Sequence, residues 1–139
     1  MSFYSDTIEL QTRGEVDIMD ITNDIAGIVR KSGLSNGIAC VFTPSSTSAI
    51  TTIEYEPGLL KDLPDALEKL FPKGARYEHE MRWHDGNGHS HVRASFMSPS
   101  LSIPFVEGNP VLGTWQQIVF VELDNKSRNR RLLVHLVGE

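Results

Sequence analysis

Four of the chain's five histidines lie within residues 77–93, in the stretch YEHEMRWHDGNGHSHVR. They are His79, His84, His89 and His91. Imidazole is the commonest protein ligand for divalent transition metals, and several imidazoles this close in sequence can converge on one ion. The spacing H-x4-H-x4-H-x-H matches no zinc-finger or zincin motif. We interpret the segment as a divalent metal site, with zinc as the expected ion, and keep a polar surface loop as the alternative.

Acidic and amide side chains close to these histidines are candidates for acid–base chemistry. Within the segment we expect Asp85 and Asn87 to be catalytic, with Gly86 and Gly88 letting the backbone fold back on itself. Two further carboxylates, Glu54 and Glu56, lie on one face of an expected strand at 51–56 and are candidate bases. A solvated strand face explains that pair equally well.

Candidate substrate-binding residues lie in the last third of the chain. Arg128, Arg130 and Arg131 are close enough to hold a phosphate through paired hydrogen bonds, although a solvated turn explains them too. Trp115 and Gln116 begin an otherwise apolar stretch, where buried amides need partners. A binding site, a subunit contact or plain packing would each explain Trp115 and Gln116.

Composition sets the class of protein. A chain of 139 residues is expected to form one domain over 1–139. The net charge of -5 argues against a general nucleic-acid binder, which needs a basic face. No apolar run approaches a membrane span and the N-terminus does not resemble a signal peptide, so we expect a cytoplasmic protein with no membrane partner. The single Cys40 suits a reducing compartment and is expected to be buried.

The first half of the chain must supply strands and two helices to position these groups. We expect a strand at 3–11, then a helix that begins near Asp17 and stops at Gly33, because isoleucines recur at helical spacing between them. The run at 38–42 is typical of a strand buried on both faces. A second helix is expected at 59–71, with its regular part beginning around Asp62 because of Pro64.

The second half is expected to be mostly strand. Residues 92–97 fit either a short helix or a strand, whereas 100–106 alternates as a strand. The stretch 111–124 is the longest strand candidate, and we expect it to form a hairpin with 131–137. His135 is then a core or interface residue. The fold class expected is α+β, a mostly antiparallel sheet with two main helices.

The order of these motifs resembles the YjbQ-type family, the group called secondary thiamine-phosphate synthase enzymes. The resemblance covers the whole chain and depends most on the GTWQ element and the N-G-x-x-H pattern, together with TSAITTIEYEPG and the basic C-terminal hairpin ending LVGE. The family pattern transfers to five positions, His79, Asn87, His91, Trp115 and Gln116. Many members have a histidine before the Thr-Ser-Ala stretch where this chain has Ser46, and His84 or His89 is an available replacement.

This resemblance implies a compact α+β subunit in a homotrimer, with metal-liganding histidines near the subunit boundaries. It also implies formation of thiamine phosphate from a pyrimidine pyrophosphate and a thiazole phosphate. We therefore expect an enzyme acting on a small phosphorylated ligand, with the metal as Lewis acid or water activator. The alternatives are a metal-dependent hydrolase with another substrate and a non-catalytic, metal-stabilised trimer. Three protein ligands with an open position would favour an enzyme, and four would favour the structural role.

Overall fold

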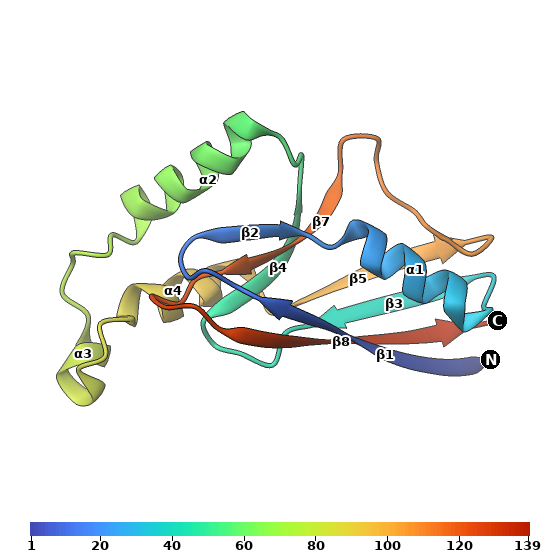
Figure 1. Cartoon of the computed structure of the whole chain (residues 1–139), viewed down its shortest axis with the longest axis horizontal. Coiled ribbons are helices and arrows are strands. Elements are labelled where there is room, and N and C mark those ends of the chain that lie inside the picture. Colours follow the sequence, from blue (N-terminus) through green and yellow to red (C-terminus); the bar gives the residue numbers. More distant parts are fainter.

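Strand β7 (Gln117–Glu122) lies at the centre of the molecule and is buried on both faces. Ile118 and Phe120 point into the main hydrophobic core, whereas Val119 and Val121 point into a second, smaller core on the other side. The strand pairs with β2 (Asp17–Asp20) and with β4 (Ser48–Ile53) to make a three-stranded antiparallel sheet (Figure 1). The structure is a computed structural model that describes all residues 1–139.

A second antiparallel sheet has five strands in the order β1-β8-β3-β5-β6. These are β1 (Ser2–Gln11), β3 (Gly37–Phe42), β5 (Ser100–Val106), β6 (Asn109–Pro110) and β8 (Asn129–Gly138). One face of this sheet packs with the smaller sheet and a helix around the main core, to which Val41, Phe105 and Val134 contribute. The other face carries exposed Ile38, Phe42 and Val137.

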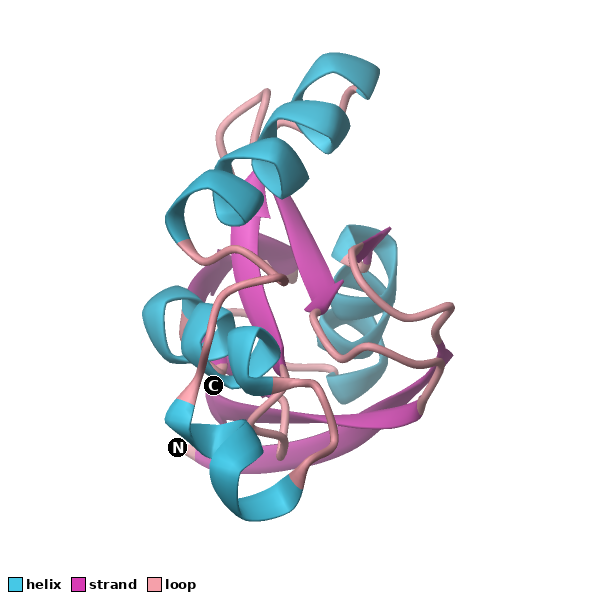
Figure 2. Cartoon of the chain, turned by 90° about the vertical axis from the view of Figure 1, so that its left-hand side faces the viewer, coloured by secondary structure: helices cyan, strands magenta, loops and turns pink.

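The helices lie on both sides of the smaller sheet. Helix α1 (Thr22–Ser32) buries Ile25 and Val29 in the main core. Helices α2 (Pro57–Leu70) and α4 (Gly88–Met97) contribute Leu67 and Ala94 to the second core. The short α3 (Glu78–Trp83) buries none of its residues. Figure 2 is seen from the end that carries α2, α3 and α4, with α1 behind the strands.

The expected α+β class is confirmed, as are the strands at 3–11 and 100–106 and the end of the first helix at Gly33. Gly33 takes the left-handed conformation, with φ of 73°. Besides the two main helices expected, the structure contains two more, α3 and α4. Residues 92–97, which fitted either a helix or a strand, belong to α4 and are helical. None of the helices combines the length and apolar character that crossing a membrane requires.

The expected C-terminal hairpin is wrong, because β7 and β8 belong to different sheets. Strand β8 instead lies between β1 and β3, with Val134 opposite Asp6 and Val41. A strand buried on both faces needs hydrogen-bonding partners along both edges. Strand β7 pairs with β2 along one edge and with β4 along the other, so no edge is left for β8. The long strand expected at 111–124 is also shorter, since residues 111–116 form a loop before β7 begins.

The starts of the first two helices were also predicted wrongly. Residues 17–20 form β2, and α1 begins only at Thr22, where Asp20 Oδ1 accepts hydrogen bonds from the backbone N–H and the hydroxyl of Thr22 at 3.0 and 2.6 Å. Helix α2 starts earlier than expected, at Pro57, because the Glu56 side chain caps its first turn. Pro64 lies inside this helix.

Strand β3 is not buried on both faces as its apolar run predicted. Its residues alternate between buried and exposed, so Cys40 is exposed and the prediction of a buried thiol is wrong. His135, opposite Cys40 on β8, is exposed on the same face and is not a core residue. The prediction of a strand buried on both faces failed because β3 also carries apolar residues on the uncovered face of the sheet.

Gly37 is where the packing of β3 against β8 tolerates no side chain. An added Cβ would clash with the carbonyl oxygen of Val137 and lie 2.8 Å from Gly138 Cα. We expect Gly37→Ala to lower the free energy of unfolding by about 1–3 kcal/mol, the usual cost of overpacking. The matched change Gly27→Ala, in the interior of α1 with nothing within 4 Å, should raise it by about 0.5–1 kcal/mol. Urea unfolding of both variants measures the difference, and equal stabilities would contradict the expected clash.

Candidate functional site

The histidine segment folds into two short helices joined by a tight reversal. Helix α3 ends at Trp83; His84 after it takes the left-handed conformation with φ of 56°, and Gly86 follows with φ of 71°. The chain then enters α4, whose Gly88 N–H donates to Glu80 Oε1 at 2.6 Å. A side chain on Gly88 would meet the Glu80 carboxylate and Tyr77, so glycine is required for this close approach. The reversal brings α3 against the first turn of α4.

His79 and His91 lie side by side as a result, with ring centroids 4.4 Å apart. His79 Nε2 lies 3.0 Å from Asn87 Oδ1 and 3.2 Å from Asp85 Oδ1. Burial, and then the neighbouring His79, lower the pKa of His91 below its ordinary value. The neutral imidazole that this favours is the form that binds a metal.

The other two histidines point elsewhere. In a helix with 3.6 residues per turn, positions two apart lie on nearly opposite sides, so His89 turns away from His91. Its Nε2 lies 2.6 Å from Glu15 Oε2, deep in the protein, and Glu15 is also paired with Lys73 at 2.9 Å. His84 is exposed at the end of α3. The four histidines therefore do not converge, and the structure brings together His79 and His91.

Asn87 connects His79 to a buried carboxylate. Its Nδ2 donates to Asp124 Oδ1 at 3.3 Å, and Asp124 is 1% exposed. Burial alone would raise the pKa of Asp124, but donors led by Arg128 and the Asn125 N–H outweigh it and hold that pKa below its ordinary value. An ionised carboxylate only accepts hydrogen bonds, so the Asn87 amide nitrogen must face Asp124 and its oxygen must face His79.

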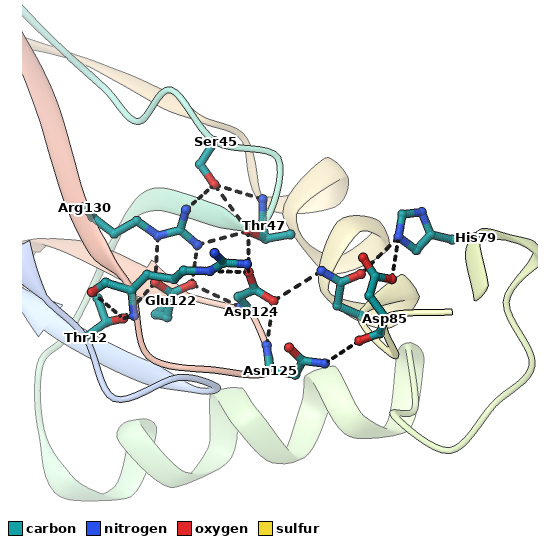
Figure 3. Close-up of polar contacts among 11 residues, drawn as sticks. Thr12, Ser45, Thr47, His79, Asp85, Glu122, Asp124, Asn125 and Arg130 are labelled. Carbon is teal, nitrogen blue, oxygen red and sulfur yellow. Dashed lines mark hydrogen bonds and ion pairs between the residues drawn. The ribbon is translucent and has the colours of Figure 1, made fainter. Parts of the chain in front are cut away.

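A second buried carboxylate, Glu122, extends this network. Glu122 is fully buried and accepts from Arg130 Nε at 2.7 Å and Nη2 at 2.6 Å. Arg130 also donates to the hydroxyls of Ser45 and Thr47 at 2.8 and 3.0 Å. Thr47 in turn lies 3.4 Å from Asp124 Oδ2. Polar contacts thus run from Arg130 to His79 (Figure 3).

The three arginines do not form one open cluster. Arg130 is 13% exposed against Glu122, so its guanidinium is used inside the protein. Arg128 donates to Asp124 from Nε at 2.8 Å but remains 38% exposed. Arg131 is exposed and faces Glu9 at 3.8 Å.

The remaining predicted site residues lie outside the network. Glu54 is exposed after β4, and the Glu56 carboxylate caps α2 by accepting from the Gly58 N–H at 2.8 Å. Trp115 is exposed in the loop before β7. Gln116 donates to Thr52 Oγ1 at 3.2 Å. None of these side chains has a hydrogen bond to the paired histidines.

A small pocket borders His91. It has a volume of about 180 Å³ and is lined by two serines of the loop before β4, by the first residue of β4, by residues of α4 and by the proline that follows α4: Ser45, Ser46, Ser48, His91, Ala94, Ser95 and Pro99. Sequence reasoning missed this serine loop, and it missed the roles of Glu122 and Asp124. The signal for the last two was present, since acidic residues ending an apolar strand are followed by Arg128 and Arg130.

The fold and this site define a single-domain α+β protein whose paired histidines are tied to buried arginine–carboxylate pairs. The sequence matches the family described as UPF0047 protein YjbQ-like over residues 6–139. The chain belongs to this family. The UPF0047 protein of Methanothermobacter thermautotrophicus is 41% identical over 139 residues, which is 100% of this chain and 95% of that protein.

Solved structures agree. A YbjQ-like protein of unknown function from Sulfolobus solfataricus superposes with a TM-score of 0.94 at 36% identity, covering 99% of both chains. A YjbQ/UPF0047 protein from Clostridium acetobutylicum has a TM-score of 0.87 at 37% identity, covering 95% of this chain and 99% of that one. These descriptions name the family and no reaction.

The pairing of Arg130 with Glu122 predicts a large difference between neighbouring arginines. Arg130→Ala leaves a fully buried carboxylate without its partner, so we expect the free energy of unfolding to fall by about 3–5 kcal/mol. Arg131→Ala, at the exposed pair with Glu9, is the matched control and should change it by less than about 1 kcal/mol. Chemical denaturation tests this, and an Arg130→Ala protein as stable as the control would contradict the structural role of the pair.

Proposed function

We propose that this protein binds a divalent metal through His79 and His91, with Asp85 beside them, and acts on a small phosphorylated ligand. The specific activity that we propose is thiamine phosphate formation, the activity of the secondary thiamine-phosphate synthases that its sequence resembles. The observation that carries the proposal is the convergence of two imidazoles, a carboxylate and a hydroxyl-lined pocket at one place. Imidazoles are donors that suit zinc, and because His79 Nε2 faces the oxygens of Asn87 and Asp85, its Nδ1 is the nitrogen left for an ion.

A bound zinc would polarise a phosphoryl oxygen or lower the pKa of a water. The chain's own residues have simpler tasks. Asn87 orients the His79 ring through its oxygen, held in place by Asp124. Asp85 is exposed and next to His79, so it is better placed as a general base than Glu54 or Glu56, which lie outside the network.

Ser46 bears on how complete the metal site is. It lines the pocket that His91 borders, at the position where many members of the resembling family have a histidine. His84 and His89 do not replace that ligand, because one is exposed and the other is paired with Glu15. With these two imidazoles as its protein ligands, an ion would have positions open for water or ligand, which supports an enzyme more than a structural metal site.

The proposed site predicts bound metal. Protein purified without chelator should hold about one first-row divalent ion per chain, since imidazole ligands select such metals over magnesium. The double variant His79→Ala with His91→Ala should lose it, whereas His135→Ala, on the exposed face of β8, should keep it. Ser46→His should tighten zinc binding by supplying a third imidazole. Elemental analysis and zinc titration measure these effects.

Activity tests the same proposal. Thiamine phosphate formation from a pyrimidine pyrophosphate and a thiazole phosphate should occur with the metal-loaded protein and disappear in the double histidine variant. Full metal content in that variant would overturn the site. Metal binding without this reaction, but with phosphate-ester hydrolysis, would favour the alternative of a metal-dependent hydrolase.

The assembly proposed is a homotrimer. The uncovered face of the five-stranded sheet has exposed apolar side chains on its central strands, Ile38 at 56% and Val137 at 47% exposed, with Phe42 nearby. Large uncovered apolar patches usually mark interfaces, and a second copy of this chain is the occupant that the family resemblance implies.

Light scattering at micromolar concentration should therefore give about three times the mass of the chain. Ile38→Glu places a charge in the centre of this patch and should shift the protein toward monomer. Lys69→Glu, an exposed charge change on α2, should leave the mass unchanged. A monomeric wild-type protein would refute the trimer.

A further inference from the structure

The pocket between the serine loop and α4 is too small for a whole ligand. Sites for small molecules usually occupy about 300–1,000 Å³, whereas this pocket holds about 180 Å³. A water takes up about 30 Å³ in the liquid, so the space suits one compact polar group and a few waters. Its lining contains hydroxyls and His91 but no carboxylate, so an anionic group would not be repelled from within it.

The hydroxyl hydrogen of Ser45 has only a long contact inside the protein, to Thr47 Oγ1 at 3.4 Å. Ser45 Oγ accepts from Arg130 Nη1 at 2.8 Å and from the Thr47 N–H at 3.1 Å. A hydroxyl has two acceptor positions and one donor, so both acceptor positions are filled. The contact to Thr47 Oγ1 is longer than an ordinary O–H···O bond, so a ligand oxygen at ordinary distance could replace it.

Arg130 strengthens this donor. Its guanidinium is held by the buried Glu122 and lies 2.8 Å behind Ser45 Oγ. A hydroxyl that accepts a bond from a cationic donor becomes a better donor itself, because hydrogen bonds in a chain polarise one another. Arg130 therefore acts on the pocket through Ser45, as a positioning residue, and does not need to contact the ligand.

We propose that this pocket is an oxyanion subsite in which the Ser45 hydroxyl, polarised by Arg130, donates a hydrogen bond to a phosphoryl oxygen of the ligand. The subsite deepens the proposed function and relies on it for the phosphorylated ligand and its reaction at the neighbouring histidines. In this proposal the phosphate is recognised by serine hydroxyls of the pocket and not by the arginines directly. The rest of the ligand would extend out of the pocket past His91.

Calorimetric titration with inorganic phosphate and with pyrophosphate tests the subsite, using zinc-loaded and chelator-treated protein. Ser45→Ala should weaken phosphate binding by at least about tenfold, the value of one hydrogen bond to a charged group. Ser45→Thr keeps the hydroxyl and should stay within about threefold of wild type. Ser102→Ala, an exposed serine on β5, is the matched control and should bind as wild type does.

The outcomes separate the subsite from the metal site. Weakened phosphate binding in Ser45→Ala, with unchanged zinc content and an unchanged unfolding midpoint, supports the subsite. If the wild type binds phosphate in the same way but no zinc, the subsite stands and the proposed metal enzyme fails. Equal phosphate affinity in wild type and Ser45→Ala, or no phosphate binding by the wild type, overturns the subsite. If Ser45→Ala has a lowered unfolding midpoint, the phosphate affinity of Ser45→Thr tests the subsite instead. A loss of about tenfold in that variant, which keeps the hydroxyl, would contradict the hydroxyl's role.

Discussion

Two buried carboxylates at the end of β7, each neutralised by an arginine, determine how the end of β7 meets the start of β8. Glu122 and Asp124 are almost completely removed from water, and an unpaired carboxylate there would cost several kcal/mol. Arg130 and Arg128 must therefore return to them from the start of β8 and the turn before it. Because β7 and β8 lie in different sheets, the Arg130–Glu122 pair holds the sheets together at this end, while the Arg128–Asp124 pair closes the turn between the two strands.

The same pairs organise the candidate site. Arg130 binds the hydroxyls of Thr47 and of Ser45, which lines the pocket, while Asp124 fixes the amide of Asn87 and through it the ring of His79. Loss of either carboxylate would therefore disturb stability and site geometry together. This linkage explains why arginines that look like phosphate ligands in the sequence are occupied inside the protein.

Helix α3 depends on the site in a different way. It buries no residue, so hydrophobic packing contributes little to its position. Polar contacts of His79 and Glu80, and the bond that Asn125 donates to the Asp85 carbonyl at 2.9 Å, hold the segment in place instead. A segment held mainly by its functional groups is expected to respond when a ligand or metal engages them. Ordering of the segment and occupation of the site are then linked.

Local patterns in the sequence determined the α+β class, the strands at the two ends of the chain and the end of α1 at Gly33, because alternation, helical spacing and glycine punctuation depend on near neighbours. The cluster of histidines and Asn87 was visible for the same reason. Only the tertiary structure decided that β8 pairs with β1 and β3, because strand partners are chosen by long-range burial. It also decided which histidines meet: the helical conformation of residues 88–97 turns His89 toward Glu15 and leaves His91 beside His79. The burial of Arg130 against Glu122 likewise depends on two strands in different sheets, a relation that no local pattern contains.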